Sequence, residues 1–202
     1  MRYGTQNQSH WEASLLRGVR VYESRLGQTE ELVASYVSEI QRAVTGPDGD
    51  CLFNCTGTSV RDQGTNLYLI AMDVPDREPR FMGGLQCSER PDHIYFKGAI
   101  VAPAFRGMRL LTALVAYANG REWQLNDLPH RCVVRIFGDL GLNLSSSRAF
   151  ECNGFQAVGL ERHQIRNDAF DAHLAATADE QGGFWSLKYE AAGPTADHLI
   201  KL

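Results

Sequence analysis

The chain has 202 residues, of which 44% are hydrophobic and 22% are charged. This composition is typical of a soluble globular protein, and it excludes a disordered or membrane-embedded chain. The 20 basic and 24 acidic residues give a net charge of −4 at pH 7, which disfavours a general nucleic-acid-binding surface. The length fits a single domain over residues 1–202.

The five cysteines form no C-x-x-C pair and have no histidine at zinc-finger spacing. We therefore expect neither a metal site nor a disulfide framework. The first ten residues contain no apolar segment, so neither a signal peptide nor a membrane anchor is indicated. On this basis we expect a cytoplasmic protein.

The first predicted elements are two amphipathic helices, which give residues 1–50 a helical character. Hydrophobic residues at spacings of three, four and seven predict a helix over residues 9–26. The same criterion predicts a second helix over residues 30–44, buried through Leu32 and Tyr36.

The remainder of the chain alternates between strands and helices. Strands are predicted over residues 67–73, 80–88, 93–101, 131–137, 155–162 and 184–189, and helices over residues 107–120, ended by Gly120, and 144–152. Hairpins combined with one strand-helix-strand crossover predict an α/β (α+β) fold with a mixed, mostly antiparallel sheet flanked by helices. The long segment over residues 163–183 predicts a helical insertion, either a surface excursion or a lid beside a substrate pocket.

A buried strand, a tight turn and a helix follow one another from Gly98 to Ala118. The first N–H groups of a helix have no internal partner, and the helix dipole places partial positive charge there. The backbone from Arg106 to Leu110 could therefore hold a phosphate or pyrophosphate. The alternative is an ordinary strand-to-helix connection with a surface arginine.

A second segment runs from the strand-like Cys132–Phe137 through Asn143 to Ser145–Phe155. Together the two segments resemble the GNAT family of acyl-CoA N-acyltransferases. In that family a V-x-P-x-x-R-G-x-G-x-G/A turn follows the fourth strand, and an N-x-x-A-x-x-x-Y-x-x-x-G-F pattern follows the fifth. The matching residues are Val101, Pro103, Arg106, Gly107, Asn143, Gly154 and Phe155.

The chain departs from the family pattern at three positions. Arg109 stands where the family's second glycine usually lies, and Leu111 stands where its final Gly or Ala lies. Phe150 occupies the position where many members carry the Tyr that protonates the departing thiolate. Ser146, Ser147 or Cys152 could replace that acid.

The resemblance implies a splayed strand pair that holds acetyl-CoA or another acyl-CoA. It also implies transfer of the acyl group to an amine of a small molecule or peptide. In such a site, backbone N–H groups of the fourth strand polarise the thioester and Asn143 contacts the pantetheine arm. The cofactor-binding residues implied are Ile100, Val101, Arg106, Gly107, Met108, Arg109, Leu110, Asn143, Ser146 and Phe150.

The family often uses a Glu of the fourth strand as the general base, but residues 93–101 contain no carboxylate. His93 has an unperturbed pKa of about 6.5, which suits proton removal near neutrality. Tyr95 lies two residues on, on the same strand face, and could act as an acid or as a substrate contact. His93, Tyr95 and Asn143 form the predicted catalytic set. Further candidates for the base are Glu89, Asp92 and Asp139.

Three functions are consistent with these patterns. The first is a CoA-dependent N-acyltransferase. The second is a noncatalytic GNAT-like binding module, which would explain the missing tyrosine and strand carboxylate together. The third is an acyltransferase that takes its donor from an acyl-carrier protein, because Arg109 and Leu111 would crowd the diphosphate of CoA. A homodimer is also left open.

Overall fold

The computed structural model describes residues 18–26, 30–45, 65–125, 131–137, 144–164 and 183–192. The elements in these ranges are β1 (Val19–Glu23), η1 (Ser24–Leu26), α2 (Glu30–Thr45), β2 (Thr65–Met72), β3 (Arg80–Glu89), β4 (His93–Val101), η2 (Pro103–Phe105), α3 (Leu110–Leu125), β5 (Arg131–Phe137), α4 (Leu144–Glu151), β6 (Gln156–Gln164) and β7 (Gly183–Ala191). None of the described helices is both long and apolar enough to cross a membrane.

The seven strands form one sheet in the order β1-β2-β3-β4-β5-β7-β6. Every neighbouring pair is antiparallel except β4 and β5, which are parallel and connected through α3. This arrangement confirms the predicted mixed, mostly antiparallel sheet. The six predicted strands are all present, two of them with the predicted ends and four with ends that differ by at most two residues.

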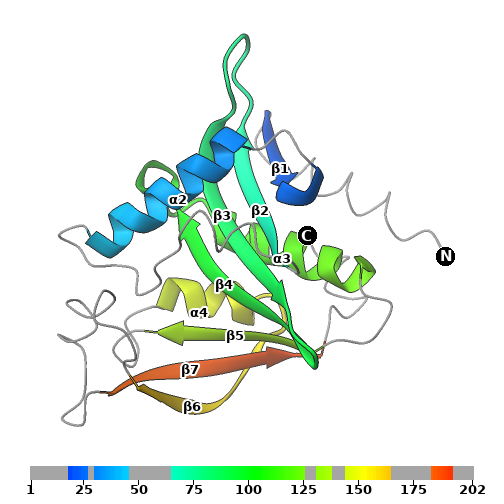
Figure 1. Cartoon of the computed structure of the whole chain (residues 1–202), viewed down its shortest axis with the longest axis vertical. Coiled ribbons are helices and arrows are strands. Elements are labelled where there is room, and N and C mark those ends of the chain that lie inside the picture. Colours follow the sequence, from blue (N-terminus) through cyan, green and yellow to red (C-terminus); the bar gives the residue numbers. More distant parts are fainter. Residues whose placement is uncertain are drawn as a thin grey trace.

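Helices cover both faces of the sheet, with α2 on one face and α3 and α4 on the other (Figure 1). The larger core cluster lies on the side of α3 and α4 and includes the fully buried Phe96 and Leu114. The smaller cluster lies under α2 and includes Tyr36, Leu69 and Ile100. The helix predicted over residues 30–44 is confirmed as α2.

The helix predicted over residues 9–26 is wrong where the structure describes this segment. Val19–Glu23 is a strand that pairs antiparallel with β2, with Val19 opposite Met72. β-branched residues at positions 19 and 21 favour a strand, and the free edge of β2 supplies its partner. Residues 9–17 lie outside the described residues. Residues 165–182 of the predicted insertion also lie outside them, and the described ends of that insertion, residues 163–164 and 183, belong to strands.

The helix α3 continues past Gly120, which the sequence predicts as its end. Glu122, one turn from the true end, is buried, and its Oε1 accepts hydrogen bonds from Asn66 Nδ2 (2.7 Å) and Tyr68 Oη (2.6 Å). These contacts hold the last turns against the sheet. They outweigh the roughly 1 kcal/mol that a glycine costs inside a helix.

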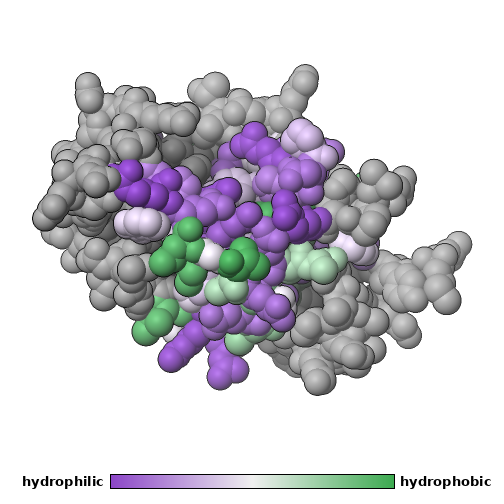
Figure 2. Space-filling view, turned by 90° about the horizontal axis from the view of Figure 1, so that it is seen from below, coloured by the Kyte–Doolittle hydropathy of each residue, from purple (hydrophilic) through white to green (hydrophobic). Residues whose placement is uncertain are grey.

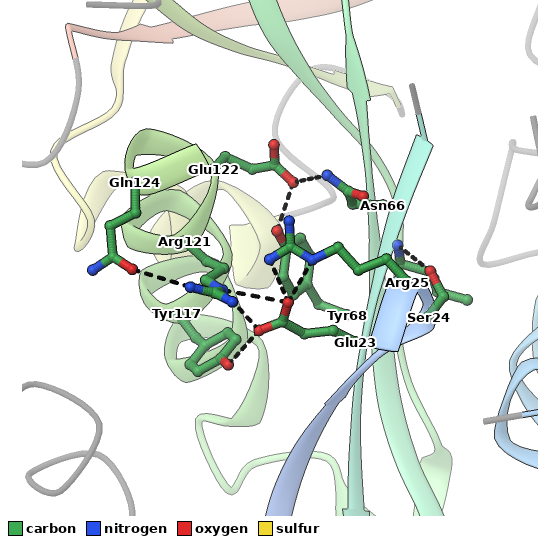
Figure 3. Close-up of polar contacts among 10 residues, drawn as sticks. Glu23, Ser24, Arg25, Asn66, Tyr68, Tyr117, Arg121, Glu122 and Gln124 are labelled. Atoms are coloured by element: carbon green, nitrogen blue, oxygen red, sulfur yellow. Dashed lines mark hydrogen bonds and ion pairs between the residues drawn. The ribbon is translucent and has the colours of Figure 1, made fainter. Parts of the chain in front are cut away.

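A buried polar cluster ties the edge strand β1 to α3 (Figure 3). Glu23 accepts hydrogen bonds from Tyr117 Oη (2.7 Å), Arg121 Nε (3.0 Å) and Arg25 Nε (2.7 Å). Burial alone would raise the pKa of Glu23. The hydrogen bonds from Tyr117 and Arg25, with the charges of Arg25 and Arg121, outweigh burial and hold that pKa below its ordinary value.

The Gly154-Phe155 pair ends α4 and closes the aromatic core. Gly154 has φ +81°, its N–H donates to Glu151 O (3.0 Å), and Phe155 N–H donates to Phe150 O (3.2 Å). This is a Schellman motif with its usual hydrophobic contact, since the Phe150 and Phe155 ring centroids lie 5.1 Å apart. Phe150 also packs against Phe96 and is 1% exposed. The expectation that Phe150 contacts a cofactor is therefore wrong, because core aromatic rings enclose its side chain.

The strand β6 forms an edge of the sheet at the lower end of Figure 1. Val158 and Leu160 on this strand are about half exposed. Figure 2, seen from below, shows hydrophobic side chains surrounded by polar ones. A register shift between Ala157 and Gly159 places a bulge at Val158, and bulges limit edge-to-edge pairing of sheets. The homodimer stays a prediction.

Replacing Glu23 by Gln should lower the free energy of unfolding at pH 7 by about 1–3 kcal/mol, because it removes the charge that three donors share. The folded pKa of Glu23 is lower than the unfolded value of about 4.3, so its contribution is complete above that value. The contribution is lost as the pH falls through the folded pKa. Urea denaturation should show the difference between the two proteins shrinking below about pH 4.

The matched control is Glu39→Gln, which removes an exposed ion pair with Arg42 in α2. We expect this control to change the free energy of unfolding by less than about 0.5 kcal/mol. Equal losses for the Glu23 and Glu39 variants, or a pH-independent loss for Glu23→Gln, would contradict the assigned role of the buried cluster.

Replacing Phe150 by Tyr should destabilise the protein by about 1–3 kcal/mol, because the added hydroxyl lies within an aromatic core cluster. Thermal denaturation measures the loss, and Phe105→Tyr at a half-buried position is the comparison. An unchanged melting temperature for Phe150→Tyr would show that the ring can reach water or a polar partner.

Candidate functional site

The parallel strands β4 and β5 are paired along only part of their length. Pairing begins at His93 opposite Arg131 and ends at Phe96 opposite Val134. Both strands continue beyond this point without pairing to each other, while the other edge of β5 pairs with β7 from Cys132 to Phe137. Figure 1 shows the two strands together at one end and diverging toward the other. This confirms the predicted splay. The last residues of β4 have main-chain groups that do not bond to β5, and these groups face the gap between the two strands.

A bulge in β4 accompanies the splay. On β3, Gly84 pairs with Ile100 and Gln86 pairs with Lys97, so Leu85 alone faces Gly98 and Ala99. Gly98 adopts φ +58°, a conformation that favours glycine. Such an extra residue bends the strand that carries it and increases its twist. The bulge thus lies where β4 parts from β5.

Tyr36 of α2, which lies on the sheet face opposite α3 and α4, holds this bulge in place. Its hydroxyl donates a 2.6 Å hydrogen bond to the carbonyl oxygen of Gly98. The ring lies directly over Gly84, where an added Cβ would come within 2.5 Å of it. Gly84 therefore provides the space that lets Tyr36 reach the bulge.

The chain turns sharply between the end of β4 and the start of α3. Ala102 N–H donates to Met82 O (2.9 Å), and Arg106 N–H donates to Pro103 O (3.3 Å). Gly107 then adopts φ +82°. An ideal Cβ on Gly107 would find no atom within 4 Å among the described residues, so the turn faces open space there.

The N-terminus of α3 follows the turn that ends β4. Its first hydrogen bond runs from Ala113 N–H to Arg109 O (3.1 Å). The N–H groups before Ala113 have no partner within the helix, and the positive end of the helix dipole lies beside them. Leu110 is buried at this start, while Met108 is exposed. Their backbone N–H groups, rather than their side chains, are the features suited to an anion.

Arg109 adopts the backbone conformation for which a glycine is ordinarily used. Its φ is +57°, which costs an L-residue roughly 1–2 kcal/mol relative to the right-handed conformation. Its side chain is exposed, so it adds a cation at the mouth of the turn. Leu111 packs against the hydrophobic core.

The helix α4 lies next to this turn. Asn153, just after α4, is buried, and its Nδ2 donates to Thr112 O (3.0 Å) in the first turn of α3 and to Ala149 O (2.7 Å). Ser146 is half-buried in the first turn of α4. Asn143 lies outside the described residues, so its predicted contact with pantetheine and its catalytic role stay predictions.

Polar side chains gather on the sheet face away from α3 and α4, next to the splay. Their neighbours along the strands, such as Phe96 and Val134, point into the core, so alternation directs this set to the other face. We call this set the polar face. It consists of Tyr95 (β4), Arg135 (β5), Glu161 and His163 (β6) and Ser186 (β7).

Close contacts connect the polar face across the strands. The Arg135 guanidinium lies 5.3 Å from the centre of the Tyr95 ring, and its Nε lies 2.5 Å from Glu161 Oε2. His163 Nε2 lies 2.7 Å from Ser186 Oγ. Arg135 and Ser186 lie beside the part of β5 that has separated from β4. Arg135 follows Val134, the last β5 residue that pairs with β4, and Ser186 pairs with Phe137.

The protonation states on the polar face differ. Burial raises the pKa of Tyr95, so the phenol keeps its proton near neutrality. The hydrogen bond from Arg135 lowers the pKa of Glu161. Burial, reinforced by the charge of Arg135, lowers the pKa of His163, so its imidazole is neutral near pH 7.

The structure places His93 away from the splay. It lies in the first paired position of β4, four residues before Lys97, or about 13 Å along a strand. Its Nδ1 lies 2.7 Å from Asp92 Oδ1. The His93 ring also packs edge-on against the Tyr95 ring, with centroids 6.2 Å apart. His93 as the base stays a prediction, and Tyr95 lies where the strands begin to part. Within the described ranges, no group of three His, Cys, Asp or Glu residues could hold a metal ion.

Sequence reasoning missed Arg135, Glu161, His163 and Ser186. Residue 163 was assigned to the start of an insertion, although β6 continues to residue 164. The signal was the spacing of two between Glu161 and His163, which directs both side chains to one face of a strand.

No protein-family model and no curated protein matches the sequence. Solved structures match the fold. The ribosomal-protein-S18-alanine N-acetyltransferase from Escherichia coli aligns over 88% of this chain and 96% of its own, with 13% identity and a TM-score of 0.58. A GNAT-family acetyltransferase from Streptococcus pneumoniae aligns over 86% of this chain and 98% of its own, with 13% identity and a TM-score of 0.53. The chain therefore has the fold of the GNAT N-acetyltransferases.

Proposed function

We propose that this protein is an N-acyltransferase that moves an acetyl or other acyl group from acyl-CoA to an amine of a small molecule or peptide. The observation that carries the proposal is the splay between β4 and β5, with the start of α3 following the turn at the end of β4. A pantetheine arm is an extended chain of amides, and it needs main-chain partners along one side. A diphosphate needs N–H donors and positive charge.

In this proposal, the residues after the β4 bulge bind the pantetheine. Ile100 and Val101 supply main-chain groups on the side that β5 leaves free. The turn from Arg106 to Leu110 receives the phosphates, with N–H groups at the start of α3 and the exposed cation of Arg109.

Acyl transfer then takes place in the gap between the two strands. The amine nitrogen attacks the thioester carbonyl carbon, and a β4 N–H group stabilises the developing oxyanion. The polar face lies on the side of the gap away from α3 and α4, where an amine can approach. Tyr95, protonated at neutral pH, is suited to donate a hydrogen bond to the acceptor or to the departing sulfur.

An acyl-carrier protein is the second candidate donor, because Arg109 and Arg106 place exposed cations at the mouth of the turn. Such a donor presents pantetheine without the adenosine diphosphate end of CoA, and an acidic carrier would pair with these cations. The noncatalytic alternative predicts donor binding without any turnover.

Calorimetric titration with acetyl-CoA, followed by a thiol-release assay with probe amines, tests the proposed function. The probes are spermidine, a lysine-containing peptide and a peptide with a free N-terminal alanine, the last suggested by the Escherichia coli structure. We expect saturable one-site binding and amine-dependent release of CoA thiol. Binding without release for every probe would favour the noncatalytic module, and absence of binding would contradict CoA dependence.

Replacing Arg109 by Gly should separate the backbone role of this residue from its charge. The free energy of unfolding should rise by about 1 kcal/mol, since glycine adopts a positive φ without strain. Acetyl-CoA affinity should fall roughly 10- to 100-fold, because a charge-assisted phosphate contact is lost. Thermal denaturation and calorimetric titration measure the two effects.

The matched control for this variant is Asp76→Gly, because Asp76 also has φ +57° but lies in the loop between β2 and β3. It should gain similar stability and keep its acetyl-CoA affinity. Unchanged acetyl-CoA affinity in Arg109→Gly, with weakened binding of an acyl-carrier donor, would favour the carrier protein instead.

A further inference from the structure

We propose that His163, held by Ser186, is the general base that accepts the proton from the acceptor amine. This inference rests on the proposed function and adds to it a catalytic residue on β6. The strand lies outside both segments that carry the GNAT resemblance.

The position of His163 relative to the gap is the first argument. Phe137 of β5 pairs with Ser186 of β7, and Ser186 pairs with Glu161 of β6. His163 pairs with Phe184, two residues before Ser186, so its backbone lies just beyond the described end of β5, at the splayed side of the sheet. Its Nε2 contacts the hydroxyl of Ser186, so the ring leans across β7 toward β5. β7 and β5 lie one strand spacing of about 4.8 Å apart, so the ring lies on the polar face, one strand back from the strand that borders the gap. In the proposed step, an amine that approaches over β5 on this face passes its proton to the ring through bridging water.

The charged groups around His163 are the second argument. Arg135 of β5 and Lys188 of β7 bring positive charge, and Glu161 on the same strand brings negative charge. Burial and Arg135 keep the imidazole neutral near pH 7, and Glu161 partly offsets the charge that forms when the ring is protonated. Glu161 itself is held ionised by Arg135, and a carboxylate with a lowered pKa is a weak base.

Ser186 is suited to both protonation states of the ring. In the tautomer that carries its proton on Nε2, the ring donates to Ser186 Oγ both as a neutral imidazole and as an imidazolium, and Nδ1 is the atom that gains and loses the proton. The 2.7 Å contact can therefore persist while the proton is gained and lost. Because Ser186 is buried, it positions the ring and does not itself meet the substrate.

The proposed step balances as follows. The amine nitrogen forms a bond to the thioester carbonyl carbon, and its N–H bond breaks as the proton moves to His163. The carbon–sulfur bond breaks, and CoA leaves as a thiolate that takes a proton from Tyr95 or water. The imidazolium then returns its proton to solvent, and Tyr95, where it was the donor, regains a proton from solvent.

The test measures kcat/KM against pH for the unaltered protein and its variants, with acetyl-CoA and either spermidine or the N-terminal alanine peptide. We expect the rate of the unaltered protein to fall below the pKa of His163. His163→Gln, which can keep the contact to Ser186, should lower kcat by about 100- to 10,000-fold and remove this fall, with acetyl-CoA affinity unchanged. Ser186→Ala keeps the imidazole and should move the midpoint of the fall.

The control variant is His93→Gln, which removes the other candidate histidine on the same sheet. A loss of the pH-dependent fall in that variant, or full activity with an unchanged profile in His163→Gln, would overturn the assignment of His163 while leaving the proposed function in place. If the unaltered protein binds acetyl-CoA and transfers nothing to any probe amine, the proposed function fails and the assignment fails with it. If His163→Gln does not fold, an unmoved midpoint in Ser186→Ala overturns the assignment.

Discussion

The hydrogen bond from Tyr36 to the carbonyl of Gly98 is the contact on which the site depends. It holds an extra residue of β4 in a bulge, and the bulge bends β4 where it would otherwise continue beside β5. Gly84 is part of the same constraint, because a side chain there would collide with the Tyr36 ring. A sheet that would otherwise be continuous therefore contains a gap bordered by main-chain groups.

The two faces of the sheet supply different chemistry to this gap. On one face, the start of α3 offers N–H donors and positive charge, and Asn153 fixes that turn to α4. On the other face, Arg135 and His163 belong to strands that lie together only in the folded sheet. A donor and an acceptor can thus approach from opposite sides. The buried Glu23 cluster contributes by holding β1 and α3 against the same sheet.

Local sequence patterns predicted much of the fold, because strands with alternating residues and an amphipathic α2 are determined by nearby residues. Val19–Glu23 could not be predicted in this way, since its strand form depends on pairing with β2, about fifty residues away in sequence. The turn before α3 was identified from Arg106 and Gly107. His163 was missed because its neighbours on β5 and β7 are distant in sequence, and Phe150 was misassigned because its burial depends on packing against Phe96.

The most direct test of the account is amide NMR of the isotope-labelled protein during titration with acetyl-CoA. The account predicts that the largest shifts occur at the amides of Ile100, Val101, Gly107 and Leu110, on both sides of the turn. It also predicts small shifts at β1 and in the loop between β2 and β3. Saturable shifts confined to other parts of the sheet, or no shifts at millimolar acetyl-CoA, would contradict the claim that the splay and the start of α3 form the donor site.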